Sequence, residues 1–262
     1  MISLIPLLAT IGLCLGMLLA CELGRRTAAT TIARNPDGLS KGTGAAEAAV
    51  FALLGLLVAF SFSGAASRFE DRRHLITAEA NAIGTAYLRV DLLPADAQPE
   101  LRTLFREYAR VRAVVYEDAS DAAATKARAD RATALQGMIW NKAVTAFADP
   151  ATSGQAIMLL TNALNEMIDI TTTRAMATRN HPPLVVFALL GVLSLIGSFL
   201  IGHSVAAAGP GRSWLQTSIF ALVLPLTVYV IVELELPRIG LVVVNSADTV
   251  VGELPEFKQA PP

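Results

Sequence analysis

A cluster of charged side chains directly follows a long apolar segment in this 262-residue sequence. It consists of Arg68, Glu70, Asp71, Arg72 and Arg73. Rings of such charges at the mouth of a pore would set its ion preference, whereas arginines at the end of an apolar helix also extend toward lipid headgroups. Because the cluster sums to only +1, the sequence leaves the sign of any ion preference open.

Other polar residues could serve as metal ligands or catalytic groups only in larger sets than the sequence provides. Glu70 and His74 are four positions apart and would share a helical face, but two ligands do not make a metal site. Glu233 and Glu235 provide too few oxygens for calcium, which takes roughly six to eight. No combination of Ser, His and Asp, phosphate-binding glycine loop or carboxylate pair within an apolar segment supplies a nucleophile or base. We therefore predict no metal, no cofactor and no enzymatic activity.

Large apolar side chains precede the charged cluster at three- and four-residue spacing. Leu53, Leu56 or Leu57, and Phe60 form one stripe on a helix. Brought together from several subunits, such a stripe would narrow a pore and make its wetting unfavourable. The alternative is that these side chains pack against lipid or neighbouring helices. Ser61, Ser63, Gly64, Ala65, Ala66 and Ser67 then form a run of small residues, which in a membrane permits close helix contact or leaves room for water.

The composition indicates a membrane protein. Hydrophobic residues make up 53% of the chain and charged residues 16%, whereas soluble domains contain about 25% charged residues. Four segments without formal charge are long enough to cross a bilayer, at about 20 residues each. They are 1–21, 48–67, 182–203 and 213–232. The first ends in Leu-Leu-Ala-Cys, as a cleaved signal sequence would, but no basic residue precedes it, and we expect it to be retained as a span.

Most of the charge lies between the second and third apolar segments, where 67–179 holds 14 basic and 14 acidic residues. Apolar residues at helical spacing predict helices over 100–117 and 121–147, and a third capped by Thr152 or Ser153. The second span has no proline before Pro94, so its helix should continue to about residue 92, whereas 22–47 reads as a loop.

We therefore predict an all-α integral membrane protein with four transmembrane helices and an inserted helical soluble domain. Its parts are a first transmembrane hairpin (1–66), the soluble domain (67–181), a second hairpin (182–236) and a C-terminal tail (237–262).

The charge distribution says less about partners and orientation. A net charge of −1 argues against binding to nucleic acid, which requires a basic excess. Basic residues near the predicted spans number five on one side and six on the other, so the positive-inside rule does not decide the orientation.

Three passages resemble a known family. Residues 59–73, AFSFSGAASRFEDRR, resemble the end of the second transmembrane helix of bestrophins, where an apolar constriction precedes an arginine-rich stretch. Residues 79–87, EANAIGTAY, and 233–240, ELELPRIG, are similar to the bacterial bestrophin-like family. The sequence departs from true bestrophins at Phe69 and Glu70, where a pair of tryptophans is typical, and in lacking their acidic calcium clasp.

The resemblance implies an oligomeric channel for inorganic ions. It implies a homo-oligomer, with a pentamer favoured, that conducts small anions through a pore lined by the second transmembrane helix. It also implies a bacterial inner membrane, with the helical domain and both termini in the cytoplasm. The alternative is a membrane-anchored sensor or assembly protein whose helical domain binds a partner or small ligand.

Overall fold

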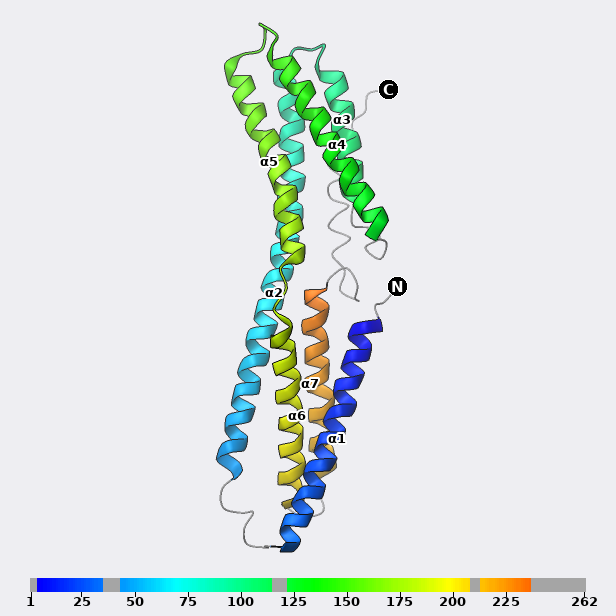
Figure 1. The fold of residues 1–262 in the computed structure, drawn as a ribbon. Coiled ribbons are helices and arrows are strands. Elements are labelled where there is room, and N and C mark those ends of the chain that lie inside the picture. The colour runs from blue at the N-terminus through cyan, green and yellow to red at the C-terminus, as the bar shows by residue number, and fades with distance from the viewer. Residues whose placement is uncertain (1–3, 35–42, 115–121, 208–212, 237–262) are drawn as a thin grey trace. The chain divides into compact units, whose positions relative to one another are not determined.

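The computed structural model describes residues 4–34, 43–114, 122–207 and 213–236, and within them it is helical and contains no strand (Figure 1). The helices follow in the order α1 (Leu4–Arg34), α2 (Thr43–Arg89), the short 3-10 helix η1 (Val90–Leu92), α3 (Gln98–Val114), α4 (Ala122–Phe147), α5 (Gly154–Arg179), α6 (Leu184–Ala207) and α7 (Ser213–Glu235). This confirms the predicted all-α class. The predicted tail, 237–262, lies outside the described residues.

Four of the described helices are long and apolar enough to cross a membrane: α1, α2, α6 and α7. The chain divides into two compact units. The first, called the membrane unit, contains the chain up to Ser67 together with His181–Leu236. The second, called the helical unit, contains Arg68–Asn180. The described residues of the predicted soluble domain between the second and third spans are thus helices joined by short turns.

The membrane unit is apolar both inside and outside. Its core contains Met17, Leu54, Leu190 and Ile231, one residue from each of its four helices. Large apolar side chains also cover the outside; Leu184, for example, is 85% exposed. A helix that is hydrophobic on all sides must be covered on all sides, which a bilayer does. Composition and burial therefore agree on a membrane location.

Helix α1 extends well beyond the predicted first span. Residues 22–34 were expected to lie in a loop, but they continue α1 to Arg34. One local reason is an ion pair: Arg26 Nε donates a 2.9 Å hydrogen bond to Glu22 Oε1 one turn earlier. A Glu four positions before an Arg stabilises a helix. The turn residues on which the loop prediction depended, 35–38, lie outside the described residues.

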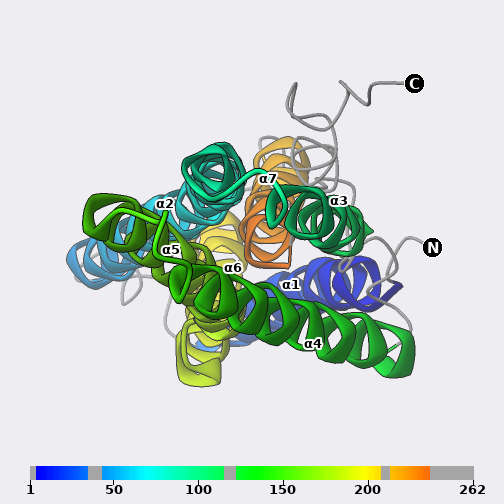
Figure 2. The same ribbon diagram turned by 90° about the horizontal axis from the view of Figure 1, so that it is seen from above.

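The helical unit has a conventional buried core. Its members come from the last part of α2, η1 and α3, α4 and α5, and they include Tyr87, Phe105, Leu135 and Met167. The rings of Tyr87 and Phe105 meet edge to face. Helices α3 and α4 lie side by side in both views (Figures 1 and 2). Ser153, one of the two predicted caps, caps α5. Its side chain accepts a 3.1 Å hydrogen bond from the amide of Ala156.

Candidate functional site

The predicted apolar stripe lies on the outer face of α2. Leu53 and Leu56 are about half exposed, and Phe60 is 69% exposed. On the opposite side of the helix, Leu54 and Ala65 are buried in the core of the membrane unit. This arrangement follows from helical geometry, because positions 53, 56 and 60 lie within about 60° of one another at about 100° per residue. The stripe therefore remains available to lipid or to another subunit.

Leu57, the alternative to Leu56 in the predicted stripe, lies closer to the core. Its side chain is partly buried and packs against the core of the membrane unit. Leu56 is the residue that shares the outer face with Leu53 and Phe60. The sequence left these two leucines as alternatives because a helix rotated by a few tens of degrees satisfies the same spacing.

Arg72, one of the predicted charges at the pore mouth, is buried instead. Its guanidinium donates hydrogen bonds to the carbonyl oxygens of Ala177, at 3.3 Å, and Asn180, at 3.1 Å. Carbonyls in the last turn of a helix lack partners within that helix, so Arg72 supplies donors at the end of α5. Its cationic group also lies where a helix carries partial negative charge.

The other charges of the cluster are more accessible. Glu70, Asp71 and Arg73 are exposed, and Arg68 is half-buried. Arg73 Nη1 lies 3.2 Å from Glu70 Oε1 in an exposed ion pair. His74 is exposed as well. In the described residues, no three or more His, Cys, Asp or Glu side chains are grouped so that they could hold a metal ion.

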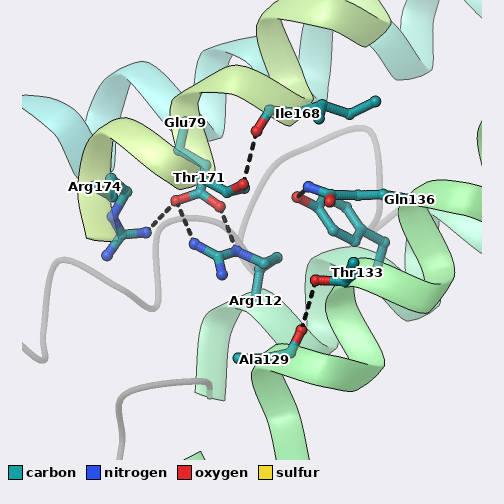
Figure 3. Close-up of polar contacts among 9 residues, drawn as sticks. Glu79, Arg112, Ala129, Thr133, Gln136, Ile168, Thr171 and Arg174 are labelled. Carbon is teal, nitrogen blue, oxygen red and sulfur yellow. Dashed lines mark hydrogen bonds and ion pairs between the residues drawn. The ribbon is translucent and has the colours of Figure 1, made fainter. Parts of the chain in front are cut away.

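The structure also reveals a buried charge cluster in the helical unit. Glu79, on α2, is 0% exposed and binds Arg112 of α3 and Arg174 of α5 (Figure 3). Arg112 uses two nitrogens, and the bond from its Nη2 to Glu79 Oε2 is 3.0 Å long. We call these three residues the Glu79 cluster. Bonds from a guanidinium to a carboxylate are among the strongest hydrogen bonds in proteins, so the cluster ties three helices together.

The electrostatics of the Glu79 cluster follow from its burial and its charges. Glu79 lies beyond the apolar segment that ends at Ser67. Burial raises the pKa of Glu79, but the hydrogen bonds and positive charges of Arg112 and Arg174 outweigh burial and hold the pKa below its ordinary value. Nearby, Tyr108 accepts a 2.9 Å hydrogen bond from Gln136, and burial raises the pKa of Tyr108 to about 12. The carboxylate is thus kept ionised and the phenol neutral.

Sequence reasoning missed this cluster, although a signal was present. Ile76, Glu79, Ile83 and Tyr87 follow one another at three- and four-residue spacing, so Glu79 occupies a core position of an amphipathic helix. A carboxylate at such a position needs a cationic partner. The sequence does not say which of the 14 basic residues in 67–179 provides it.

A second pair of polar residues lies at one end of the membrane unit. The Glu235 carboxylate, at the end of α7, is 3% exposed, and its Oε2 lies 3.7 Å from His181 Nδ1. His181 stands just before α6 and is 41% exposed. Glu233, two positions before Glu235 in the chain, is also buried. The two carboxylates considered for calcium are therefore both buried.

Comparisons with known proteins agree with this architecture. The sequence model of one protein family, the bestrophin-like domain, matches residues 11–249. The fold is similar to the crystal structure of a point mutant of a bacterial bestrophin homologue from Klebsiella pneumoniae, with a TM-score of 0.66. That match has 14% sequence identity and covers 94% of this chain and 99% of the other, so it demonstrates a shared fold. No curated protein sequence matches the chain.

Proposed function

The chain belongs to the bestrophin-like family, and we propose that it forms a homo-oligomeric ion channel, pentameric by preference, with a pore lined by α2. The observation that carries this proposal is the outer face of α2, where Leu53, Leu56 and Phe60 form an exposed apolar stripe. Repeated around an axis, large apolar side chains make a constriction that excludes water unless it widens. Apart from Phe62, the residues at 61–67 are small, which leaves room for water next to the constriction.

We propose that the channel conducts small anions. The buried charges of the helical unit support this. Among its described residues, three arginines are buried and only one carboxylate: Arg72, Arg112, Arg174 and Glu79. Buried charges are screened by salt much less than exposed ones. The interior of the helical unit therefore carries an excess of positive charge, which attracts anions. The exposed charges next to the span are mixed in sign and favour neither ion.

We also propose a location and an orientation for the protein. The membrane location follows from the four apolar helices. A bacterial inner membrane, with the helical unit and both termini in the cytoplasm, is proposed from the family, because the distribution of basic residues near the spans does not decide the side.

Replacing Phe60 by Ala tests the proposed constriction. We expect purified protein in liposomes to conduct chloride, and Phe60→Ala to raise the flux severalfold because the smaller side chain widens and wets the neck. Phe62→Ala is the matched control. Phe62 is also an exposed phenylalanine of α2, but it lies about 200° around the helix from Phe60, so its flux should equal that of the wild type.

Two results would contradict the proposal at different levels. Equal flux in the wild type and Phe60→Ala would make Phe60 a packing residue and leave the channel standing. No flux from either protein, while both are folded and oligomeric, would overturn the channel and favour the membrane-anchored sensor or assembly protein.

A further inference from the structure

A pocket of about 500 Å³ opens into the membrane unit between α1, α6 and α7. Apolar side chains dominate its wall, including Leu13 of α1, Phe187 of α6 and Val228 of α7. Gly191 also lines it, and a Cβ added there would meet no heavy atom within 4 Å. The volume lies within the usual range for small-molecule sites, about 300–1,000 Å³. The pocket is thus large enough for an alkyl chain.

The polar groups of this pocket are gathered at the ends of two helices. Glu235 stands at the end of α7 and His181 just before α6. The remaining hydroxyl in the wall, that of Thr10, donates a 2.8 Å hydrogen bond to the carbonyl of Pro6. Glu235 and His181 both lie where membrane spans end. The polar end of the pocket therefore coincides with the boundary between hydrocarbon and headgroups.

We infer that this pocket binds an alkyl chain that carries a cationic nitrogen, with the chain between α1, α6 and α7 and the nitrogen at Glu235. Carboxylate oxygens accept hydrogen bonds and attract cations, so Glu235 selects a head group that donates. A basic nitrogen already lies next to this group, since His181 Nδ1 is 3.7 Å from Glu235 Oε2. A carboxylate or phosphate head on the same chain would be repelled by Glu235. The ligand is either an aminophospholipid of the bilayer or a free amphiphilic amine, and the two share this chemistry.

Binding of radiolabelled dodecylamine to the purified full chain tests the inference. The protein is captured on scintillant beads in an uncharged detergent, so that only the protein-bound amine is counted. We expect saturable binding that unlabelled dodecylamine displaces and that dodecanol and dodecanoate displace on the order of tenfold less well, because a charge-assisted hydrogen bond is lost. Equal displacement by all three compounds would overturn the assignment of the nitrogen.

Filling the pocket should abolish binding. Gly191→Leu places a side chain in open space inside it and should weaken binding at least tenfold. Gly12→Leu is the matched control, because Gly12 is an exposed α1 glycine with equally open surroundings and does not line the pocket. Ala9→Leu is a second filling variant in case Gly191→Leu does not fold. Full binding by a folded filling variant, or loss in Gly12→Leu, would overturn the site.

The role of Glu235 and the source of the ligand need separate experiments. Glu235→Gln keeps the shape but removes the charge, and it should erase the preference for dodecylamine over dodecanol. An unchanged preference would contradict the role of Glu235. In nanodiscs, competition by phosphatidylethanolamine would identify a bilayer lipid, and its absence a free amine. These readouts do not require ion flux, so the inference stands or falls independently of the channel.

Discussion

Glu79 is the buried counter-ion of two arginines in the helical unit. Its carboxylate neutralises part of the charge of Arg112 and Arg174, which are both buried. Glu79→Gln keeps the shape but leaves two guanidiniums without a counter-ion, so we expect a loss of about 3–5 kcal/mol in the free energy of unfolding. Thermal unfolding of the detergent-solubilised protein, followed by circular dichroism, measures the change.

Glu107 provides the matched control for this substitution. It pairs with Arg131 between α3 and α4, but both side chains are nearly half exposed. Exposed ion pairs contribute about 0–1 kcal/mol, so Glu107→Gln should unfold close to the wild-type temperature. Similar losses in both variants would show that burial of the Glu79 cluster does not set its energetic weight.

At the scale of single residues, the sequence predicts faces better than partners. The apolar spacing of α2 places Leu53, Leu56 and Phe60 on one exposed face. Leu56 and Leu57 are distinguished only by what packs against the other side of the helix. Arg72 follows a span just as Arg73 does, yet Arg72 binds carbonyls more than 100 positions away in the chain. Contacts between residues so far apart depend on tertiary packing, which the local pattern does not contain.

At the scale of helices, α1 and α6 approach each other through glycines. The two helices run in the same direction, and a Cβ at Gly202 would overlap the carbonyl oxygen of Cys21. A Cβ at Gly24 would overlap the carbonyl oxygen of Phe199 in the same way. Small residues allow such close packing in membranes, where burial of apolar surface drives helix association only weakly.

Gly202→Ala should therefore push the two helices apart. Because the obstacle is backbone rather than a flexible side chain, we expect a loss of about 1–3 kcal/mol in stability, seen as a lower unfolding temperature in detergent. In an open helical position the same change is neutral or stabilising. Gly12→Ala is such a control, since its Cβ meets nothing within 4 Å. If Gly202→Ala is as stable as Gly12→Ala, the close contact does not hold these helices together.

The length of the apolar segments and the positions of proline explain which helices could be predicted from the sequence. α2 continues past its apolar segment to Arg89 because no proline interrupts it, as the sequence predicts. The extension of α1 to Arg34 could not be predicted from apolar content, since this part of the helix is polar and is supported by the Glu22 and Arg26 pair. Apolar segments mark what crosses the bilayer, while the ends of helices depend on such local bonds.

At the scale of the whole molecule, the proposed channel requires that the outer face of α2 contact other subunits. Four helices in one subunit have too little material to enclose a hydrated path, so a pore requires several copies. Leu53, Leu56 and Phe60 lie outside the core of the membrane unit, where they contact lipid in a monomer and other subunits in an oligomer.

The mass of the purified particle decides between these states. We expect native mass spectrometry in detergent to give about five times the 27.7 kDa of one chain, because a closed ring of identical subunits is the arrangement that brings every α2 to one axis. Another ring size would correct the number of subunits but keep the pore. A monodisperse monomer would overturn the channel, because no path would then be enclosed. It would leave the amine pocket intact, since α1, α6 and α7 of one subunit form that pocket.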